Sequence, residues 1–466
     1  MKLLFLAATL LTSCDPAPKP QPATQTQEAH QTVIVDTSYR PKNFVKEYGS
    51  TAKSSSPKII DLSDRNITYA PFDLADHFKS AKVLILEAPE GDFTYVKDTS
   101  VCYKYPKGNM AIQMGGLFPF AYSEGSHIIL RDNNIGILHY DSNGKFVETI
   151  ARNLMPAMKY DRRAKHYEVD MSKVIESNVV KITGNELIYL TMDSTGIGTK
   201  YWYDLENKRV DKIEHFGTGR RGIYHTPTPL NDSVSFTFVP SLATANRPLL
   251  HMFNPKGDTI ATFMNYLKYP DEKFSAYAQN MMQVYTYTLE GKNYFKQMLN
   301  DTIFSITSPT EISAEYLMKL GRYKQDDKSA FWGTGDDFIG VGSVLETPTL
   351  LYINYGFGKD YENWDYKKPF YAVWDKRSDK LIHIDAKNKT GNKAFVPNTM
   401  PQSLPLLFDK FRVSPQGKIF VCYHRHTLEK LMELPAFKAL PAAQQEFTQK
   451  IAAQLGNKKL AVMVIQ

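Results

Sequence analysis

The sequence predicts an all-β fold of the β-propeller class with short helical insertions. Aromatic residues make up 12% of the 466 residues, and such rings favour the half-buried, pleated surface of a sheet. A unit of three or four short strands recurs at intervals of about 50 to 60 residues, which is typical of propeller blades rather than of a solenoid. The chain also ends in an apolar strand with no partner beside it in the sequence. Together these observations favour a closed ring of small sheets.

The clearest copy of the unit covers residues 127–150. Apolar runs predict strands at 127–130, 137–140 and 145–150. Asn143-Gly144 separates the last two strands and favours a tight hairpin, because both residues tolerate positive φ. This unit is therefore expected to form consecutive antiparallel strands.

The same pattern recurs, less clearly, through the rest of the chain. Further copies are expected at residues 186–213, 233–263, 293–321 and 349–384, and another begins at 411–424. An Asp or Asn lies near the corresponding turn of several units, at Asp141, Asp204, Asn254 and Asp375. This spacing indicates successive blades of one large domain.

Helical periodicity is confined to two short segments, both expected as insertions between strands. In residues 441–456, Phe447, Ile451 and Leu455 recur at the spacing of one helix face, and Gly456 supplies a C-cap. The second candidate covers residues 271–283.

The apolar segment 458–466 predicts a terminal strand that needs a partner. We expect it to pair near residues 82–89 and so to close the ring. Closure removes a sheet edge that would otherwise invite aggregation.

The N-terminal residues predict a lipid-anchored protein. Lys2 precedes an apolar run at residues 3–11, which is too short to span a bilayer and has the form of a signal peptide. The sequence Leu11-Thr12-Ser13-Cys14 resembles the lipobox of bacterial lipoproteins, in which the cysteine receives a diacylglycerol and becomes the new N-terminus. The alternative is an ordinary secretory signal with a chance cysteine.

These features predict three segments. Residues 1–13 are expected to be a lipoprotein signal peptide, residues 14–57 the lipidated Cys14 and a flexible tether rich in Pro and polar residues, and residues 58–466 the propeller. The expected location is the cell envelope, with Cys14 in the outer membrane and the propeller either periplasmic or exposed at the surface.

Charge and cysteine content exclude several classes of function. A formal net charge of +7 spread over 466 residues is too mild for a nucleic-acid partner. Cys102 and Cys422 lack the spacing of a zinc site. Two separate buried thiols are favoured over a disulfide between them, although an oxidising envelope permits one. We expect no metal and no other cofactor.

Several segments resemble a known family. The stretch at 127–150, the sequences "LNDTIFSIT" and "PFYAVWDKRSDKLIHID", and the opening "LSD...APFDL" resemble the six-bladed β-propeller lipoproteins of Gram-negative bacteria, an NHL-like and largely uncharacterised group. The resemblance covers residues 58–466 and implies six blades. One departure is residues 151–169, which replace the Gly-Pro-Gly-rich turn that follows this blade in the family.

The segment "GTGRRG", residues 217–222, has the form of a dinucleotide-binding fingerprint. That fingerprint needs a helix after it, and Pro227 and Pro229 forbid one. We therefore interpret the segment as a bend between blades. Arg220 and Arg221 then lie near a propeller face, either solvated or in contact with an anionic ligand.

An aromatic loop is the other candidate binding site. Tyr361, Trp364 and Tyr366 fall between two expected strands, where exposed rings can stack on sugars or peptides. The alternative is packing against a neighbouring blade. His424 and His426 are expected on one face of a strand, but without a third ligand they predict no metal site.

The sequence contains no motif that names a reaction, so no catalytic residue is assigned. We favour a non-catalytic binding or scaffolding module whose partners are the membrane, through Cys14, and a glycan or protein ligand. The alternative is an envelope enzyme that acts on glycans or a related polymer with acidic residues gathered at the propeller channel.

Overall fold

The structure is a computed structural model that describes residues 33–36, 47–48 and, apart from gaps, 56–466. The longest gaps lie at residues 218–227, 239–247, 265–283 and 325–337, and shorter gaps interrupt other loops. The helix expected at 271–283 therefore lies outside the described residues.

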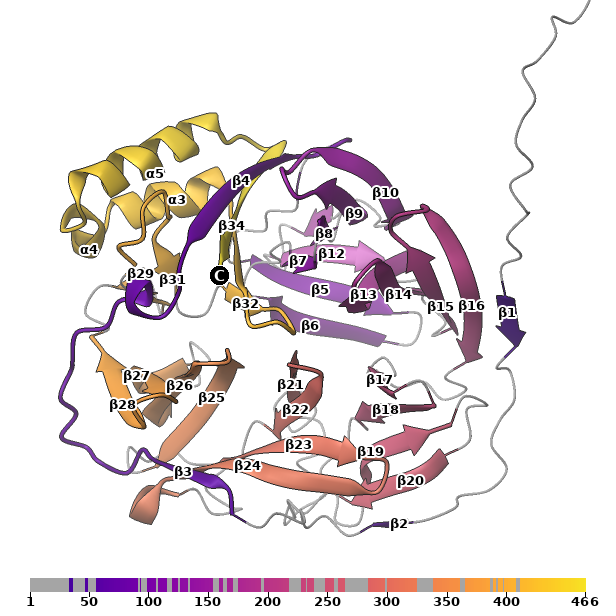
Figure 1. Cartoon of the computed structure of the whole chain (residues 1–466), viewed down its shortest axis with the longest axis horizontal. Coiled ribbons are helices and arrows are strands. Elements are labelled where there is room, and N and C mark those ends of the chain that lie inside the picture. Colours follow the sequence, from indigo (N-terminus) through magenta and orange to yellow (C-terminus); the bar gives the residue numbers. More distant parts are fainter. Residues whose placement is uncertain are drawn as a thin grey trace, which may run out of the picture.

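Six sheets, each with four antiparallel core strands, surround a common axis as the blades of a propeller (Figure 1). The first strand of each blade lies nearest the axis and the fourth lies at the rim (Figure 1). This arrangement confirms the predicted fold class.

The first three blades follow one another along the chain. Blade one comprises β7 (Phe120–Glu124), β8 (His127–Asp132), β9 (Gly136–Asp141) and β10 (Phe146–Arg152). Blade two comprises β13 (Ile175–Thr183), β14 (Glu186–Asp193), β15 (Ile197–Asp204) and β16 (Arg209–Gly217). Blade three comprises β17 (Thr228–Asn231), β18 (Val234–Phe238), β19 (Pro248–Phe253) and β20 (Thr259–Met264). The strands expected within residues 127–150 correspond to β8, β9 and β10.

The last three blades complete the ring. Blade four comprises β21 (Val284–Leu289), β22 (Lys292–Gln297), β23 (Thr302–Ser308) and β24 (Glu311–Lys319). Blade five comprises β25 (Ile339–Glu346), β26 (Leu350–Asp360), β27 (Asp365–Asp375) and β28 (Lys380–Ile384). Blade six comprises β32 (Phe411–Val413), β33 (Ile419–Tyr423), β34 (Lys459–Ile465) and β4 (Ala81–Glu87).

Blade six joins the two ends of the propeller, as the sequence predicts. The C-terminal strand β34 pairs antiparallel with β4, from Lys459 opposite Glu87 to Ile465 opposite Ala81. Leu86 and Val462 from these strands are fully buried in a cluster shared with blade one. The apolar terminal strand thus has its partner almost 400 residues earlier in the chain.

Alternating strand direction gives the ring two different faces. We call the face at which each first strand begins, and blades connect to one another, the connector face. The first strand turns into the second, and the third into the fourth, at the opposite face, which we call the turn face. Different loops lie at the two faces, so a site on the connector face and a site on the turn face are formed by different parts of the sequence.

An additional sheet arises from the connections that enter blades one and two. It contains β5 (Thr99–Tyr105), β6 (Gly108–Met114), β11 (Lys159–Asp161) and β12 (His166–Asp170), with β12 parallel to β5. Because both connections start and end at the connector face, this sheet belongs to that face, and Figure 1 shows β5, β6 and β12 across the middle of the ring. The unusual segment 151–169 thus supplies part of it.

The chain before β4 runs around the rim of the propeller. The strands β1 (Val33–Asp36), β2 (Glu47–Tyr48) and β3 (Lys58–Asp61) pair in parallel with β16, β20 and β24, respectively (Figure 1). Blades two, three and four thereby gain a fifth strand. Two of these strands fall within residues 14–57, and the domain boundary at residue 58 stays a prediction.

Helices are few among the described residues and follow β33. They are α3 (Arg425–Met432), α4 (Pro435–Lys438) and α5 (Ala442–Gln454). The helix expected at 441–456 is α5, whereas α3 replaces the strand expected at His426, because β33 ends at Tyr423 and His424 precedes the helix. Within the described part of the chain, no helix is both long and apolar enough to cross a membrane.

Shorter elements complete the description. They are a small sheet of β29 (Lys389–Thr390), β30 (Lys393–Val396) and β31 (Leu406–Leu407), and the 3-10 helices η1 (Leu74–Asp76) and η4 (Gly321–Tyr323).

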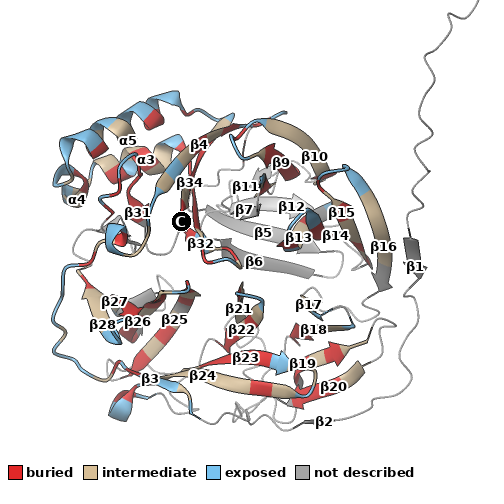
Figure 2. Cartoon of the chain, viewed as in Figure 1, coloured by how far each residue is buried: buried red, intermediate tan, exposed pale blue. Residues whose placement is uncertain are grey.

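The hydrophobic core lies between neighbouring blades rather than at the axis. Figure 2 shows buried positions along the strands where sheets face one another. Blades five and six enclose the largest cluster together with α3 and α5, including Tyr352, Phe411 and Leu428. Because the core is distributed between blades, the axis is free to hold a cavity.

Candidate functional site

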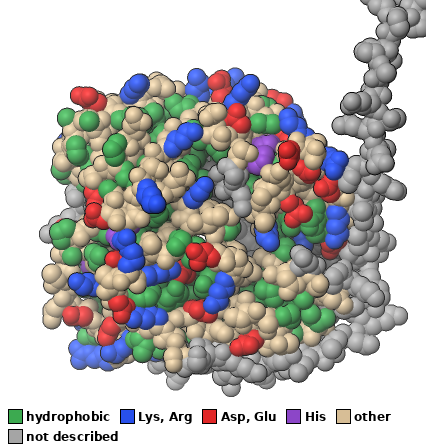
Figure 3. All heavy atoms as spheres, in the orientation of Figure 1, with side chains coloured by type: hydrophobic (Ala, Val, Ile, Leu, Met, Phe, Trp, Pro, Cys, Tyr) green, Lys and Arg blue, Asp and Glu red, His purple; other side chains and the backbone are tan. Residues whose placement is uncertain are grey.

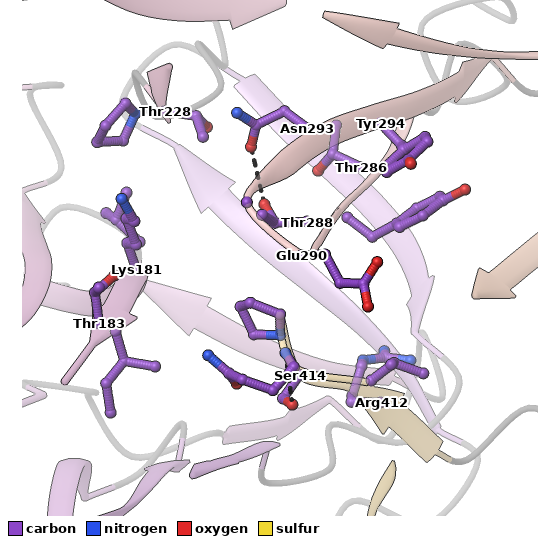
Figure 4. A pocket seen from close by; sticks show the side chains of 18 of the residues that line it. Lys181, Thr183, Thr228, Thr286, Thr288, Glu290, Asn293, Tyr294, Arg412 and Ser414 are labelled. Carbon is purple, nitrogen blue, oxygen red and sulfur yellow. Dashed lines mark hydrogen bonds between the residues drawn. The ribbon is translucent and has the colours of Figure 1, made fainter. Parts of the chain in front are cut away.

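A cavity of about 750 Å³ lies at the axis on the turn face, between side chains from blades two to six (Figure 4). Its lining includes the end of β13 and the turns that follow β21 and β32, which places it at that face. This volume is in the range of pockets that bind small molecules. On the surrounding surface shown in Figure 3, basic and acidic side chains are interspersed rather than gathered by sign.

The turns of blades four, five and six form a connected rim on one side of the cavity. The amide of Glu290, in the β21–β22 turn, donates to the carbonyl oxygen of Pro415 in the β32–β33 turn at 2.7 Å. A Cβ atom at Gly417, whose φ is +81°, would lie 2.1 Å from Cδ of Pro348 in the β25–β26 turn. Contacts this close fix the positions of the three turns relative to one another.

Blade four presents hydroxyl and amide groups to the cavity. Thr286 and Thr288 are two residues apart on β21 and both line the cavity, and Asn293 lies opposite Thr288 on β22. The hydroxyl of Thr288 donates to Oδ1 of Asn293 at 2.9 Å. That bond orients the amide, and Figure 4 shows its nitrogen turned toward Thr228 across the cavity. Asn293 is only 7% exposed as a residue, and its amide nitrogen faces the cavity.

The buried carboxylate of Glu346, from blade five, also lines the cavity. Glu346 ends β25 and is 1% exposed. Tyr287 donates to Oε2 at 2.5 Å, Lys376 donates to Oε1 at 2.5 Å, and Tyr316 also donates to Oε1. Three donors from blades four and five thus occupy this carboxylate.

Burial and the neighbouring Glu346 charge keep the phenols of Tyr287 and Tyr316 protonated. Burial, followed by the adjacent Glu346 charge, raises the pKa of Tyr287 and of Tyr316 far above their usual value. Tyr287 also stacks on Tyr294, with ring centroids 4.9 Å apart and planes within 6° of parallel. One face of the cavity-lining Tyr294 ring is therefore covered within the protein.

Among the residues that the structure describes, three exposed charged side chains also line the cavity. Lys181 lies near the end of β13, on the wall formed by blades two and three, with Thr183 two residues away (Figure 4). Glu290 and Arg412 lie on the wall formed by the turns of blades four and six. The cavity thus combines a few charges with neutral hydroxyl and amide groups.

Most of the ligand-binding residues predicted from the sequence fall outside the part of the chain that the structure describes. Arg220 and Arg221 lie outside the described residues, as do Tyr361 and Trp364. Tyr366 is on β27, where its backbone pairs with Lys359, so it belongs to a strand rather than to a loop. Its side chain lies outside the described part of the chain.

The strands that flank residues 218–227 and 361–364 end at the connector face, whereas the cavity opens at the turn face. Gly217 ends the outer strand of blade two, and Thr228 begins the inner strand of blade three, as a bend between blades requires. No local pattern in the sequence marks the cavity, because its residues come from five blades.

Residues 41–433 match the family described as a domain of unknown function, DUF4933. The chain belongs to this family. No curated protein matches the DUF4933 chain.

Solved structures with similar folds share little sequence with the DUF4933 chain. A DUF4221 family member from Bacteroides vulgatus is 10% identical, with 84% of this chain and 98% of that chain covered and a TM-score of 0.40. A protein of unknown function from Bacteroides thetaiotaomicron is 9% identical, with coverage of 83% and 76% and a TM-score of 0.34. Another, from Bacteroides caccae, is 10% identical, with coverage of 66% and 94% and a TM-score of 0.32.

Proposed function

We propose that this DUF4933 propeller is a lipid-anchored binding module of the cell envelope, and that its ligand occupies the turn-face cavity without being chemically changed. The observation that carries the proposal is the convergence of five blades on a space of about 750 Å³ into which the buried Asn293 amide points. Buried donors of this kind fix the orientation of a ligand in a pocket.

The envelope location depends on the N-terminal sequence. The charge at Lys2, the short apolar run and Cys14 support attachment of a diacylglycerol, as in the NHL-like lipoproteins that the chain resembles. Acyl chains contribute about 0.8 kcal/mol per buried methylene, so several of them anchor a protein firmly. Radiolabelled palmitate should therefore enter the full chain in a bacterial host but not its Cys14→Ala variant. Equal labelling of the two would contradict the anchor.

The carboxylates of the cavity favour binding over hydrolysis. A glycosidase needs one carboxyl group as acid and a second as base or nucleophile, both available to the substrate. Glu346 is occupied by Tyr287, Tyr316 and Lys376, and Glu290 lies exposed at a turn. The envelope-enzyme alternative would require Glu346 to release these donors.

A cavity-blocking variant tests the binding role. Thr286 is exposed within the cavity, so Thr286→Trp should fill the space while leaving the blade intact. The control is Thr310→Trp, at an exposed turn of the same blade. We expect the full chain and the control to bind the same members of combined glycan and peptide arrays, and Thr286→Trp to bind none of them. Identical array profiles for all three proteins would refute a ligand site in this cavity.

A further inference from the structure

The two walls of the cavity differ in charge. On the wall formed by blades four and six, Glu290 and Arg412 bring opposite charges together (Figure 4). On the wall formed by blades two and three, Lys181 is the charged group, and none of the described cavity residues from these two blades is acidic. Within the described part of this wall, a ligand therefore meets a positive charge with no acidic cavity residue beside it.

The Asn293 amide adds a second donor directed toward that wall. Its oxygen is engaged by Thr288, so only the NH₂ end is offered to the cavity. Asn293 as a residue is only 7% exposed, and a ligand oxygen within reach of its amide nitrogen would accept a hydrogen bond from it. A ligand oxygen placed between Asn293 and Lys181 would satisfy both groups.

Apart from these groups and the Glu346 carboxylate, the polar side chains of the described lining are neutral and rich in hydroxyls. Thr183 and Thr228 lie on the Lys181 wall, and Thr286 and Ser414 lie on the opposite wall (Figure 4). A hydroxyl both donates and accepts, so these groups match a ligand that carries hydroxyls of its own.

We propose that the cavity binds an acidic carbohydrate, with a carboxylate of the sugar between Lys181 and Asn293 and its hydroxyls against the threonine side chains. This inference rests on the proposed binding function and specifies the ligand class. Thr183 and Thr228 share the Lys181 wall with apolar side chains such as Ile182, and a sugar is favoured over a peptide because its hydroxyls match these threonines. An acidic sugar uses both the Lys181 charge and the hydroxyl groups of the lining.

Two disaccharides that differ only in their carboxylates provide the test. The probes are α-1,4-digalacturonate and its neutral counterpart α-1,4-galactobiose, titrated calorimetrically into the full chain at neutral pH. We expect digalacturonate to bind at least about tenfold more tightly, since a charge-assisted hydrogen bond contributes about this much. Because the contact is ionic, high salt should reduce the ratio.

Matched variants locate the carboxylate. Lys181→Gln removes the charge at an exposed position, and Asn293→Asp exchanges the amide donor for an acceptor of the same shape. Each should reduce the affinity for digalacturonate to that for galactobiose. Lys450→Gln, which removes an equal charge at an exposed position of α5, should retain the preference. A melting curve of each variant checks that it is folded.

The outcomes separate this inference from the proposed function. Equal binding of the two sugars, unaffected by Lys181→Gln, would overturn the acidic ligand but keep the cavity as a sugar site. Failure of both sugars to bind at millimolar concentration would overturn the inference. If array peptides then bind and Thr286→Trp abolishes that binding, the proposed function stands with another ligand class.

Discussion

Replacement of Lys296 by methionine should stabilise the protein and change how its stability depends on pH. Lys296 lies on β22 and is fully buried. Its ammonium donates to the carbonyl oxygens of Gln297 at 3.1 Å and of Val341, on β25 of the next blade, at 2.9 Å. Burial lowers the pKa of this amine from 10.5 to about 7, against the opposing charge of Asp301.

The lowered pKa sets the direction and size of the effect. Between pH 7 and 10.5 the unfolded chain holds a proton on Lys296 that the folded chain releases, so the free energy of unfolding rises with pH. At about 1.36 kcal/mol per pKa unit, this rise amounts to about 3 kcal/mol between pH 6 and 9.5. Below pH 7 both states are protonated, and the full penalty of about 4–5 kcal/mol is present.

Methionine removes the charge but also the hydrogen bonds of the ammonium, including those to Gln297 and Val341, and the loss of these bonds costs about 1–3 kcal/mol. We therefore expect Lys296→Met to raise the free energy of unfolding at pH 6 by about 1–3 kcal/mol. At pH 9.5 Lys296 of the native protein is mostly neutral, so most of the cost of burying its charge is absent there too. The advantage of the variant should then disappear or become a small loss.

Urea unfolding, followed by fluorescence of the four Trp residues, measures this at several values from pH 6 to 9.5. The native chain is compared with Lys296→Met and with Lys450→Met, which replaces an exposed lysine of α5. The control should follow the native profile, whereas Lys296→Met should converge on it as pH rises. If the native and Lys296→Met profiles stay parallel within about 0.5 kcal/mol, the lysine is not held with a lowered pKa and the reasoning fails.

Two further substitutions test how neighbouring blades are joined. Glu346→Gln should leave the ammonium of Lys376 without its buried counter-charge and lower the free energy of unfolding by about 3–5 kcal/mol. Adding Lys376→Met to this variant should restore part of the lost stability. If the two groups act independently, thermal melting of the double variant would show no recovery. Gly417→Ala should cost about 2–4 kcal/mol, because its Cβ would meet Pro348 at a positive φ. The matched change Gly291→Ala should cost only about 1–2 kcal/mol, because φ is +77° there but the added Cβ would have no atom within 4 Å. Equal losses of stability in the two alanine variants would contradict close packing of the turns.

Local turn chemistry made part of the fold predictable. The hairpin at Asn143-Gly144 was predictable because the turn needs a positive φ, which Gly144 adopts at +83°, and glycine takes this conformation without strain. Ring closure was also predictable, since the apolar strand at 459–465 had no neighbour in sequence to pair with. In both cases a short segment restricts the fold by itself: one segment needs a tight turn, and the other needs a partner strand from a distant part of the chain.

Other features depend on contacts that no short segment specifies. The rim strands β1, β2 and β3 are short and pair with blades far away in sequence. The segment 151–169 could be recognised as unusual, but its sheet forms only when β12 meets β5. The helix α3 was missed because His424 and His426 were assigned to the preceding apolar strand.

The cavity could not be predicted from the sequence, because it too depends on contacts between distant segments. Lys181 and Asn293 are separated by more than 100 residues and come from different blades, and neither belongs to a recognisable motif. Sequence reasoning instead selected Trp364 and Arg220, because aromatic and basic residues in loops stand out locally. The structure assigns their flanking strand ends to the connector face, away from the cavity.

The central claim is that β34 closes the ring on β4, because this closure arranges the inner strands around the cavity. Zero-length carbodiimide cross-linking of the native chain tests it without substitution. Nζ of Lys459 lies 3.8 Å from Oε2 of Glu87, and within blade four Nζ of Lys292 lies 2.6 Å from Oε1 of Glu315. Mass spectrometry should recover both cross-linked peptides, and recovery of the Lys292–Glu315 peptide without any Lys459–Glu87 peptide would contradict closure.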